Sequence, residues 1–351
     1  MNALLWDLLK QTSRTFYKTL RILPGSVRSP IGLAYLLART TDTIADTALV
    51  PVEQRLEALQ KLRERILGTS AAPLNFSELS RHQSLSAEKL LLENIEPGIA
   101  GLDEFSPHDT QLIREALDTI TSGQALDLQR FSVASNTTEA GTPKVVALQT
   151  EDELDDYTYR VAGCVGEFWT KMCRAHLFPN DKLDDVRLLA DGVRFGKGLQ
   201  LVNILRDLPA DLRNGRCYLP ADKLAEVGLM PSDLLQPANE SRLRPLYDRY
   251  LDLSESHLAA GWEYTNVIPY RQMRVRLACA WPILIGVETI KRLRVENLFE
   301  HEGNIKISRS QVRAIIARSM LVYPFPGVWK GLFPKPVQGK GKDVARHAGL
   351  A

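Results

Sequence analysis

The sequence of 351 residues has few cysteines and no large excess of charge of either sign. Its four cysteines form no Cys-x-x-Cys pair, and its six histidines are scattered along the chain. These residues indicate neither a zinc site nor a disulfide framework, and a reduced, cytoplasmic compartment fits best. The formal net charge of +2 gives no basic field of the kind that nucleic-acid-binding proteins use, so no nucleic-acid partner is expected.

Long hydrophobic runs are also missing. The sequence has no run of about 18 uncharged apolar residues, and a helix needs about 20 to cross a bilayer, so no transmembrane helix is predicted. Residues 3–10 hold a short apolar run that contains an acid and is followed by no cleavage site. This pattern predicts an amphipathic helix rather than a secretion signal.

Strand-like alternation of polar and apolar residues is nearly absent, whereas helical periodicity covers most of the chain. We therefore predict an all-α fold. Because no Gly/Ser linker or internal repeat divides the sequence, we expect one helical domain over residues 1–322 and a tail rich in Pro, Gly and Lys over 323–351. Residues 68–82 are expected to form a loop. The longer predicted helices cover residues 28–47, 51–67, 86–96, 107–130, 151–177, 240–264, 271–296 and 311–322.

A line of polar residues recurs at helical spacing within an apolar stretch in the middle of the chain: Gln200, Asn203, Asp207 and Asp211. Burying a carboxylate without a partner is strongly unfavourable, so such a line needs basic side chains, water or a metal ion. Pro209 lies between the two aspartates and lacks an N–H group. We therefore expect the helix to end or kink at Pro209, which makes the position of Asp211 harder to predict.

The spacing Asp-x-x-x-Asp occurs at 42/46, 152/156, 181/185, 207/211 and 248/252. Three of these pairs lie among other charged residues, where a solvated helix face explains them. The pairs 42/46 and 207/211 lie in long apolar helices, and Arg39 and Arg206 accompany them. Buried ion pairs are one explanation of this pattern. Mg²⁺ is the other, because it binds through one or two carboxylates and completes its shell with phosphate oxygens and water. Two such pairs would clamp a diphosphate between them.

Motifs in the first 220 residues carry a resemblance to a known family. They are Ser13-Arg14-Thr15-Phe16, Tyr35-x-x-x-Arg39-x-x-Asp42-Thr-Ile-Ala-Asp46, Tyr157-Thr-Tyr-Arg-Val-Ala-Gly163-Cys-Val-Gly166, and Asn203-Ile-Leu-Arg-Asp207-Leu-Pro-Ala-Asp211 followed by Gly215-Arg-Cys-Tyr218-Leu-Pro. In this order they resemble the squalene/phytoene synthases, which are head-to-head trans-prenyltransferases, and the chain looks most like a bacterial squalene synthase. It departs from the family pattern at Ala45 and at Pro209-Ala210, where many relatives have an acid.

The resemblance implies a single-domain, isoprenoid-synthase-type helical bundle around a central cavity. It also implies that two farnesyl diphosphates are joined through presqualene diphosphate, which NADPH then reduces to squalene. The metal ligands for Mg²⁺ would be Asp42, Asp46, Asp207 and Asp211, and these would stabilise the departing diphosphate. Tyr157 would assist proton removal; its alternative role is that of a core tyrosine with a satisfied hydroxyl group. The substrate-binding residues implied by the family are Ser13, Arg14, Phe16, Tyr35, Arg39, Gln200, Asn203, Arg206 and Tyr218.

The reductive step would need a site for NADPH. No Gly-x-Gly-x-x-Gly motif lies between a strand and a helix, and none is expected in an all-α fold. Squalene synthases instead resemble this chain at Asn304-Ile-Lys306-Ile-Ser-Arg309, which implies that Lys306 and Arg309 bind the cofactor phosphate. A solvated basic turn is the alternative. The alternative functions are a phytoene or dehydrosqualene synthase without reduction and, in another class, a non-catalytic helical scaffold. The sequence leaves the oligomeric state open.

The C-terminal segment 321–333 is apolar and aromatic but is broken by Pro and Gly. It is too short to span a bilayer. Basic residues lie in or after it, namely Lys330, Lys335, Lys340, Lys342 and Arg346. We therefore expect this tail to hold the protein loosely at a membrane surface. The alternative is that its aromatic residues pack back on the helical core.

Overall fold

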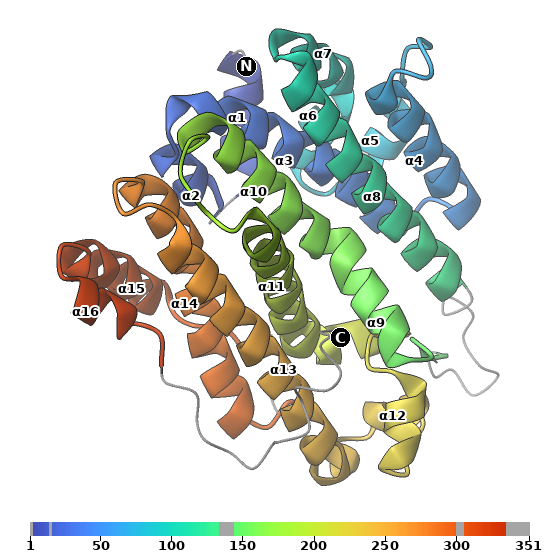
Figure 1. Ribbon diagram of the computed structural model, residues 1–351. Coiled ribbons are helices and arrows are strands. Elements are labelled where there is room, and N and C mark those ends of the chain that lie inside the picture. Colours follow the sequence, from blue (N-terminus) through green and yellow to red (C-terminus); the bar gives the residue numbers. More distant parts are fainter. Residues whose placement is uncertain (1–2, 14–15, 133–143, 300–304, 335–351) are drawn as a thin grey trace.

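The computed structural model describes residues 3–13, 16–132, 144–299 and 305–334 (Figure 1). Nearly all regular structure in this part of the chain is helical, which confirms the predicted all-α fold in a single domain. The strands found in the described ranges are β1 (Val146–Ala147) and β2 (Arg216–Cys217), which pair in parallel.

The first part of the chain forms the helices that cover one side of the bundle. These are α1 (Ala3–Thr12), α2 (Phe16–Ile22), α3 (Gly25–Asp46), α4 (Val52–Leu67), α5 (Ser77–Arg81), α6 (Ser86–Glu93), α7 (Ile95–Ala100), η1 (Gly101–Glu104) and α8 (Pro107–Phe131). Helix α5 lies inside the segment 68–82, which the sequence predicted to be a loop. It has only one and a half turns, too few for a visible hydrophobic period.

The second part of the chain supplies the longest helices. They are α9 (Glu151–Thr158), the π-helical turn η3 (Tyr159–Gly163), α10 (Cys164–Leu177), α11 (Asp185–Arg213), α12 (Ala221–Glu226), η4 (Pro231–Leu235), η5 (Pro237–Asn239), α13 (Glu240–Val267), α14 (Met273–Val295), α15 (Arg309–Val322) and α16 (Pro326–Lys330). The single helix predicted over 151–177 is therefore interrupted by η3. Such π-helical turns occur often at functional sites.

Helix α11 occupies the centre of the bundle (Figure 1). It packs against α10 and η3 and, on its other side in this view, against α13 and α14. Helices α3 and α8 pack against each other and against α10, and α15 packs on α14. The segments that carry the family motifs, α2, α3, η3 and α11, are thus assembled around one interior.

The sequence predicted that the central helix would end or kink at Pro209. The helix does not end there, because α11 continues to Arg213. A proline leaves the carbonyl group four residues earlier without its helical N–H partner. That carbonyl group belongs to Leu205, and it accepts a hydrogen bond from the Tyr247 hydroxyl group at 3.0 Å. A side chain of α13 thus replaces the missing donor, and Asp211 remains on the same helix as Asp207.

The described part of the predicted tail, residues 323–334, packs against α13 and α14. Tyr323 and Trp329 are only 3% and 1% exposed. The Arg276 guanidinium group lies 5.5–5.6 Å from the ring centroids of Tyr270, Tyr323 and Trp329, and such cation–π contacts are favourable when desolvated. Residues 335–351, with the four basic positions beyond Lys330, lie outside the described residues. In the described part no helix is long and apolar enough to cross a bilayer.

Candidate active site

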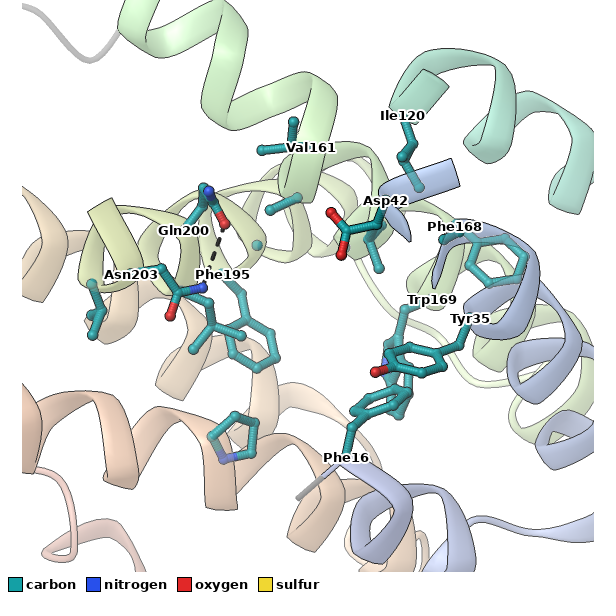
Figure 2. Close-up of a pocket in the computed structure, with 18 of the residues that line it drawn as sticks. Phe16, Tyr35, Asp42, Ile120, Val161, Phe168, Trp169, Phe195, Gln200 and Asn203 are labelled. Carbon is teal, nitrogen blue, oxygen red and sulfur yellow. Dashed lines mark hydrogen bonds between the residues drawn. The ribbon is translucent and has the colours of Figure 1, made fainter. Parts of the chain in front are cut away.

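A cavity of about 780 Å³ lies within the bundle, lined by side chains from α2, α3, α8, α10, α11 and α14. Most of its wall is apolar or aromatic. Figure 2 shows Asp42 pointing into it, with Gln200 and Asn203 on one side and Phe16 and Tyr35 on the other. The sequence-predicted site residues that line it are Phe16, Tyr35, Arg39, Asp42, Asp46, Tyr157, Gln200, Asn203, Arg206 and Tyr218.

Other predicted residues lie away from the cavity wall. Asp207 and Asp211 are not among its lining residues, although their neighbour Arg206 is. Ser13 is buried, and its hydroxyl group donates to the Leu9 carbonyl group at the end of α1. Arg14 lies outside the described residues. Lys306 and Arg309 are exposed and do not line the cavity.

The first aspartate pair lies near the C-terminal end of α3. Arg39 forms an ion pair with Asp42 one turn later, and its other terminal nitrogen contacts Glu88 at 2.5 Å. Asp42 lines the cavity. Burial, followed by repulsion from Asp46, raises its pKa to about 6. Burial also raises the pKa of Asp46, although Arg216 and Arg39 oppose the shift.

The second pair lies on the last turns of α11. Arg206 donates to Asp207 through two nitrogens, one of them Nε at 2.9 Å from Oδ1. Asp211 has no arginine beside it in the sequence. Burial and repulsion by Asp207 raise the pKa of Asp211 to about 7. Both pairs therefore contain a carboxyl group whose negative charge is poorly compensated by the protein.

The two pairs converge from different elements. Asp211 of α11 lies near enough to Asp46 of α3, Asp127 of α8 and Arg216 of β2 for their charges to shift its pKa. In the described ranges, no three His, Cys, Asp or Glu side chains come close enough together to hold a metal ion by themselves. Hard carboxylate oxygens, two on each side, fit Mg²⁺ that completes its shell with substrate phosphate oxygens and water. The raised pKa values of Asp42, Asp46 and Asp211 fit a site that a bound cation would stabilise.

A second polar cluster was not predicted from the sequence. The Tyr218 hydroxyl group donates to Asp127 Oδ2 at 2.8 Å, and Arg216 Nη1 lies 3.9 Å from the same oxygen. The ring of Tyr157 stacks on that of Tyr218 with centroids 4.7 Å apart. Burial raises the pKa of Asp127 to about 6 and that of Tyr157 above its ordinary range. Asp127 shares a helix face with Gly123. Because it has no second carboxylate at helical spacing, no sequence pattern marked it as a functional residue.

Aromatic side chains close the remaining wall. The rings of Phe16 and Tyr35 stack with centroids 4.6 Å apart, and Figure 2 shows Trp169 beside them. The amides of Gln200 and Asn203 form a long hydrogen bond of 3.5 Å. Such a wall can keep water away from a reactive intermediate, while its few polar groups can orient a ligand.

Comparisons with known proteins all point to one family. A sequence model of the squalene/phytoene synthase family matches residues 9–311. Squalene synthase ERG9 of Saccharomyces cerevisiae is 25% identical over 314 residues, which cover 90% of this chain and 66% of the relative. A bifunctional lycopene cyclase/phytoene synthase of Arthroderma gypseum is 28% identical over 313 residues, which cover 86% of this chain and 48% of the relative. The chain thus spans about half to two thirds of the length of these curated relatives.

Solved structures share the fold. A complex of TcSQS with the ligand E5700 superposes with a TM-score of 0.72 at 20% identity, covering 89% of this chain and 84% of that one. A dehydrosqualene synthase in complex with a ligand superposes with a TM-score of 0.62 at 19% identity. The match covers 90% of this chain and 95% of that one. The chain therefore shares its helical fold with these solved structures.

Proposed function

The chain belongs to the squalene/phytoene synthase family, and from that premise we propose that it is a squalene synthase. It would join two farnesyl diphosphates head to head through presqualene diphosphate and reduce that intermediate with NADPH. One observation carries the proposal: an apolar cavity of about 780 Å³ is lined by the Asp42/Asp46 pair and by Arg206, and Arg206 pairs with Asp207 of the second aspartate pair, which approaches the first from α11.

The arginines and aspartates would exchange partners when the substrate binds. Arg39 and Arg206 now bind Asp42 and Asp207. A diphosphate accepts hydrogen bonds from guanidinium groups with the same geometry as a carboxylate. The arginines can therefore turn to the leaving group and free the aspartates for metal binding. Mg²⁺ bound there would act as a Lewis acid that stabilises the departing diphosphate.

A non-reducing phytoene or dehydrosqualene synthase is the second candidate, and the position of the predicted NADPH residues favours it. Lys306 and Arg309 are exposed and absent from the cavity wall. Ile316 of α15 does line the cavity, but Arg309 precedes it by two helical turns, or roughly 10 Å. The cofactor would have to reach from that basic end of α15 to the interior.

Product analysis tests the proposed function and separates the candidates. We expect farnesyl diphosphate with Mg²⁺ and NADPH to give squalene, and presqualene diphosphate to accumulate when NADPH is omitted. The Lys306→Ala variant should likewise accumulate the cyclopropyl intermediate or form dehydrosqualene, because only the reductive step needs the cofactor phosphate contact. Arg318→Ala, another exposed arginine of α15, serves as the matched control and should still give squalene.

Other products would contradict parts of this proposal. Phytoene from geranylgeranyl diphosphate, or dehydrosqualene regardless of NADPH, would show a non-reducing synthase. Squalene as the sole product of Lys306→Ala, with unchanged dependence on NADPH, would show that the cofactor binds elsewhere. A chain that releases no diphosphate from either substrate would be a non-catalytic scaffold.

We further propose that the face formed by α15 and α16 contacts a membrane surface. Residues 305–334 include Lys306, Arg309, Arg313, Arg318 and Lys330 and no acidic residue. Leu321 and Phe325 on this face are 75% and 59% exposed. Tyr323 and Trp329, which the sequence placed in the membrane-binding segment, are buried in the core instead. Contact would therefore depend on exposed aliphatic and aromatic side chains with basic residues around them.

Sedimentation with lipid vesicles checks this face. The Leu321→Ser/Phe325→Ser double variant should pellet several-fold less than the wild type with vesicles that contain anionic lipid at low salt, because each exposed apolar side chain contributes to interfacial binding. Val186→Ser removes an equally exposed residue of α11 and should pellet like the wild type. If the double variant pelleted fully, the α15–α16 face would not be the contact.

A further inference from the structure

Three side chains at one end of the cavity lie against one another between the interior and a buried carboxylate. The rings of Tyr157 and Tyr218 stack with centroids 4.7 Å apart. Tyr218 donates its only hydroxyl proton to Asp127 Oδ2 at 2.8 Å. Because a hydroxyl oxygen has two lone pairs, the Tyr218 oxygen can in addition accept the hydroxyl proton of Tyr157. Proton transfer would then run in the order Tyr157, Tyr218, Asp127.

Asp127, the last of these three residues, can take up a proton. Asp127 Oδ1 is buried and has no hydrogen-bond partner in the part of the chain that the structure describes. An unpartnered carboxylate oxygen in a protein interior is costly, and a proton on it would remove that cost. The charged or titratable groups around Asp127 are Tyr218, Tyr157, Arg216, Arg130, Asp46 and Asp211. None of them donates to Oδ1, so the acceptor position remains open.

The proposed reaction requires such an acceptor. When one substrate loses its diphosphate, the allylic cation adds to the double bond of the second substrate and leaves a new cation. Closing the cyclopropane ring breaks a C–H bond, whose electron pair forms the last C–C bond. Two C15 diphosphates therefore give one C30 cyclopropyl diphosphate, one free diphosphate and one proton. A neutral tyrosine is a poor base for that proton unless it passes its own proton onward.

We propose that Tyr157, Tyr218 and Asp127 form the relay that removes this proton. Tyr157 receives it from the substrate while giving its own proton to Tyr218, and Tyr218 gives its proton to Asp127. Tyr157 is the group that touches the substrate, whereas Tyr218 and Asp127 act through it. This inference rests on the proposed function, because only the condensation supplies the proton.

Asp127→Asn and Tyr218→Phe test the relay, with diphosphate release and C30 product measured separately. Asparagine keeps an acceptor for Tyr218 but takes no proton, so C30 product should fall about 10²-fold. Diphosphate release should fall much less, because the arginine and aspartate pairs that ionise the substrate are unchanged. The double variant should be no slower than either single variant, since each breaks the same chain.

Controls separate a relay from a purely structural role. Asp109→Asn removes another buried carboxylate of α8, which contacts His176 outside the cavity, and should leave the ratio of C30 product to diphosphate unchanged. In Asp127→Ala, added formate should restore C30 product in a concentration-dependent way, whereas formamide, of similar size, should not. Thermal unfolding of each variant shows whether it is folded, and Tyr218→Phe provides a second test should an Asp127 variant unfold.

Several results would overturn the relay. One is an equal loss of diphosphate release and C30 product in Asp127→Asn, which would place Asp127 at the ionisation step. Another is a normal C30 rate in both Asp127→Asn and Tyr218→Phe, which would leave the departing diphosphate as the base. If the wild type makes no C30 product from any substrate, the proposed function is overturned and the relay with it.

Discussion

Asparagine in place of Asp42 or Asp207 is expected to lower C30 product formation by about 10³-fold or more while the chain stays folded. Asparagine has nearly the volume of aspartate but lacks its charge. Removing one group that stabilises developing charge in a transition state typically costs 10²- to 10³-fold in rate, and here the loss also weakens Mg²⁺ binding. Asp42 lines the cavity, and Asp207 lies close enough to Asp211 to raise its pKa.

Stability measurements should separate this effect from misfolding. Because the pKa of Asp42 is raised, its ionised form is disfavoured in the folded state relative to the unfolded chain. Without Mg²⁺, Asp42→Asn should therefore be no less stable than the wild type near neutral pH. With Mg²⁺ and diphosphate, the wild type should gain thermal stability by mass action, and the variant should gain less.

The control for this prediction is Asp118→Asn, which removes a carboxylate of α8 that pairs with Arg63 away from the cavity. It should retain the wild-type rate and dependence on Mg²⁺. A metal site at Asp42 and Asp207 would be contradicted by variants that keep near-normal rates at limiting Mg²⁺.

Much of the fold could be predicted because the apolar residues of a long helix recur at helical spacing along the sequence. Helix 107–130 of the prediction is α8, Pro107–Phe131, and helix 51–67 is α4, Val52–Leu67. The aspartate pairs could be found for the same reason, since partners four residues apart share a helix face. The neighbouring arginines, Arg39 and Arg206, were visible in the sequence beside them and do pair with Asp42 and Asp207.

Contacts between distant segments could not be predicted in this way. Glu88 reaches Arg39 across 49 residues, and Asp127 reaches Tyr218 across 91. Arg216 is held near Asp127 because its two-residue strand pairs with Val146, in a stretch that has too few residues to show alternation. A single polar residue on an otherwise ordinary helix has no local pattern, so its role depends on which helix packs opposite it.

Local rules also failed where tertiary contacts compensate for them. Pro209 is tolerated inside α11 because Tyr247, 42 residues from Leu205, donates to the freed carbonyl group. The aromatic residues near the C-terminus have the composition of an interfacial segment. Tyr323 and Trp329 are nevertheless buried, because Arg276 and Tyr270 provide a partner surface that composition alone does not reveal.

Helices α10 and η3 approach α11 closely because small residues lie on both sides of the contact. A Cβ atom built on Gly166 would lie 1.9 Å from the Gly192 carbonyl oxygen, and one on Gly196 would lie 2.1 Å from that of Ala162. In both cases the obstacle is backbone, which cannot rotate aside as a side chain can. Of the cavity-lining residues, Val161 lies on η3 on one side of the contact and Gln200 lies on α11 on the other.

Gly166→Ala and Gly196→Ala should therefore each destabilise the fold by about 3 kcal/mol, at the upper end of the usual cost of overpacking. The helices must separate to admit the methyl group, which displaces the cavity walls relative to one another. Because a shift of about 1 Å in an active site can cost 10²-fold in rate, the molecules that still fold should lose activity as well. Gly25→Ala is the matched control, since a Cβ atom there meets nothing within 4 Å. Chemical denaturation and product formation measured on the same samples decide the matter: Gly166→Ala with wild-type stability would show that α10 and α11 can move apart freely, and that their contact does not fix the shape of the cavity.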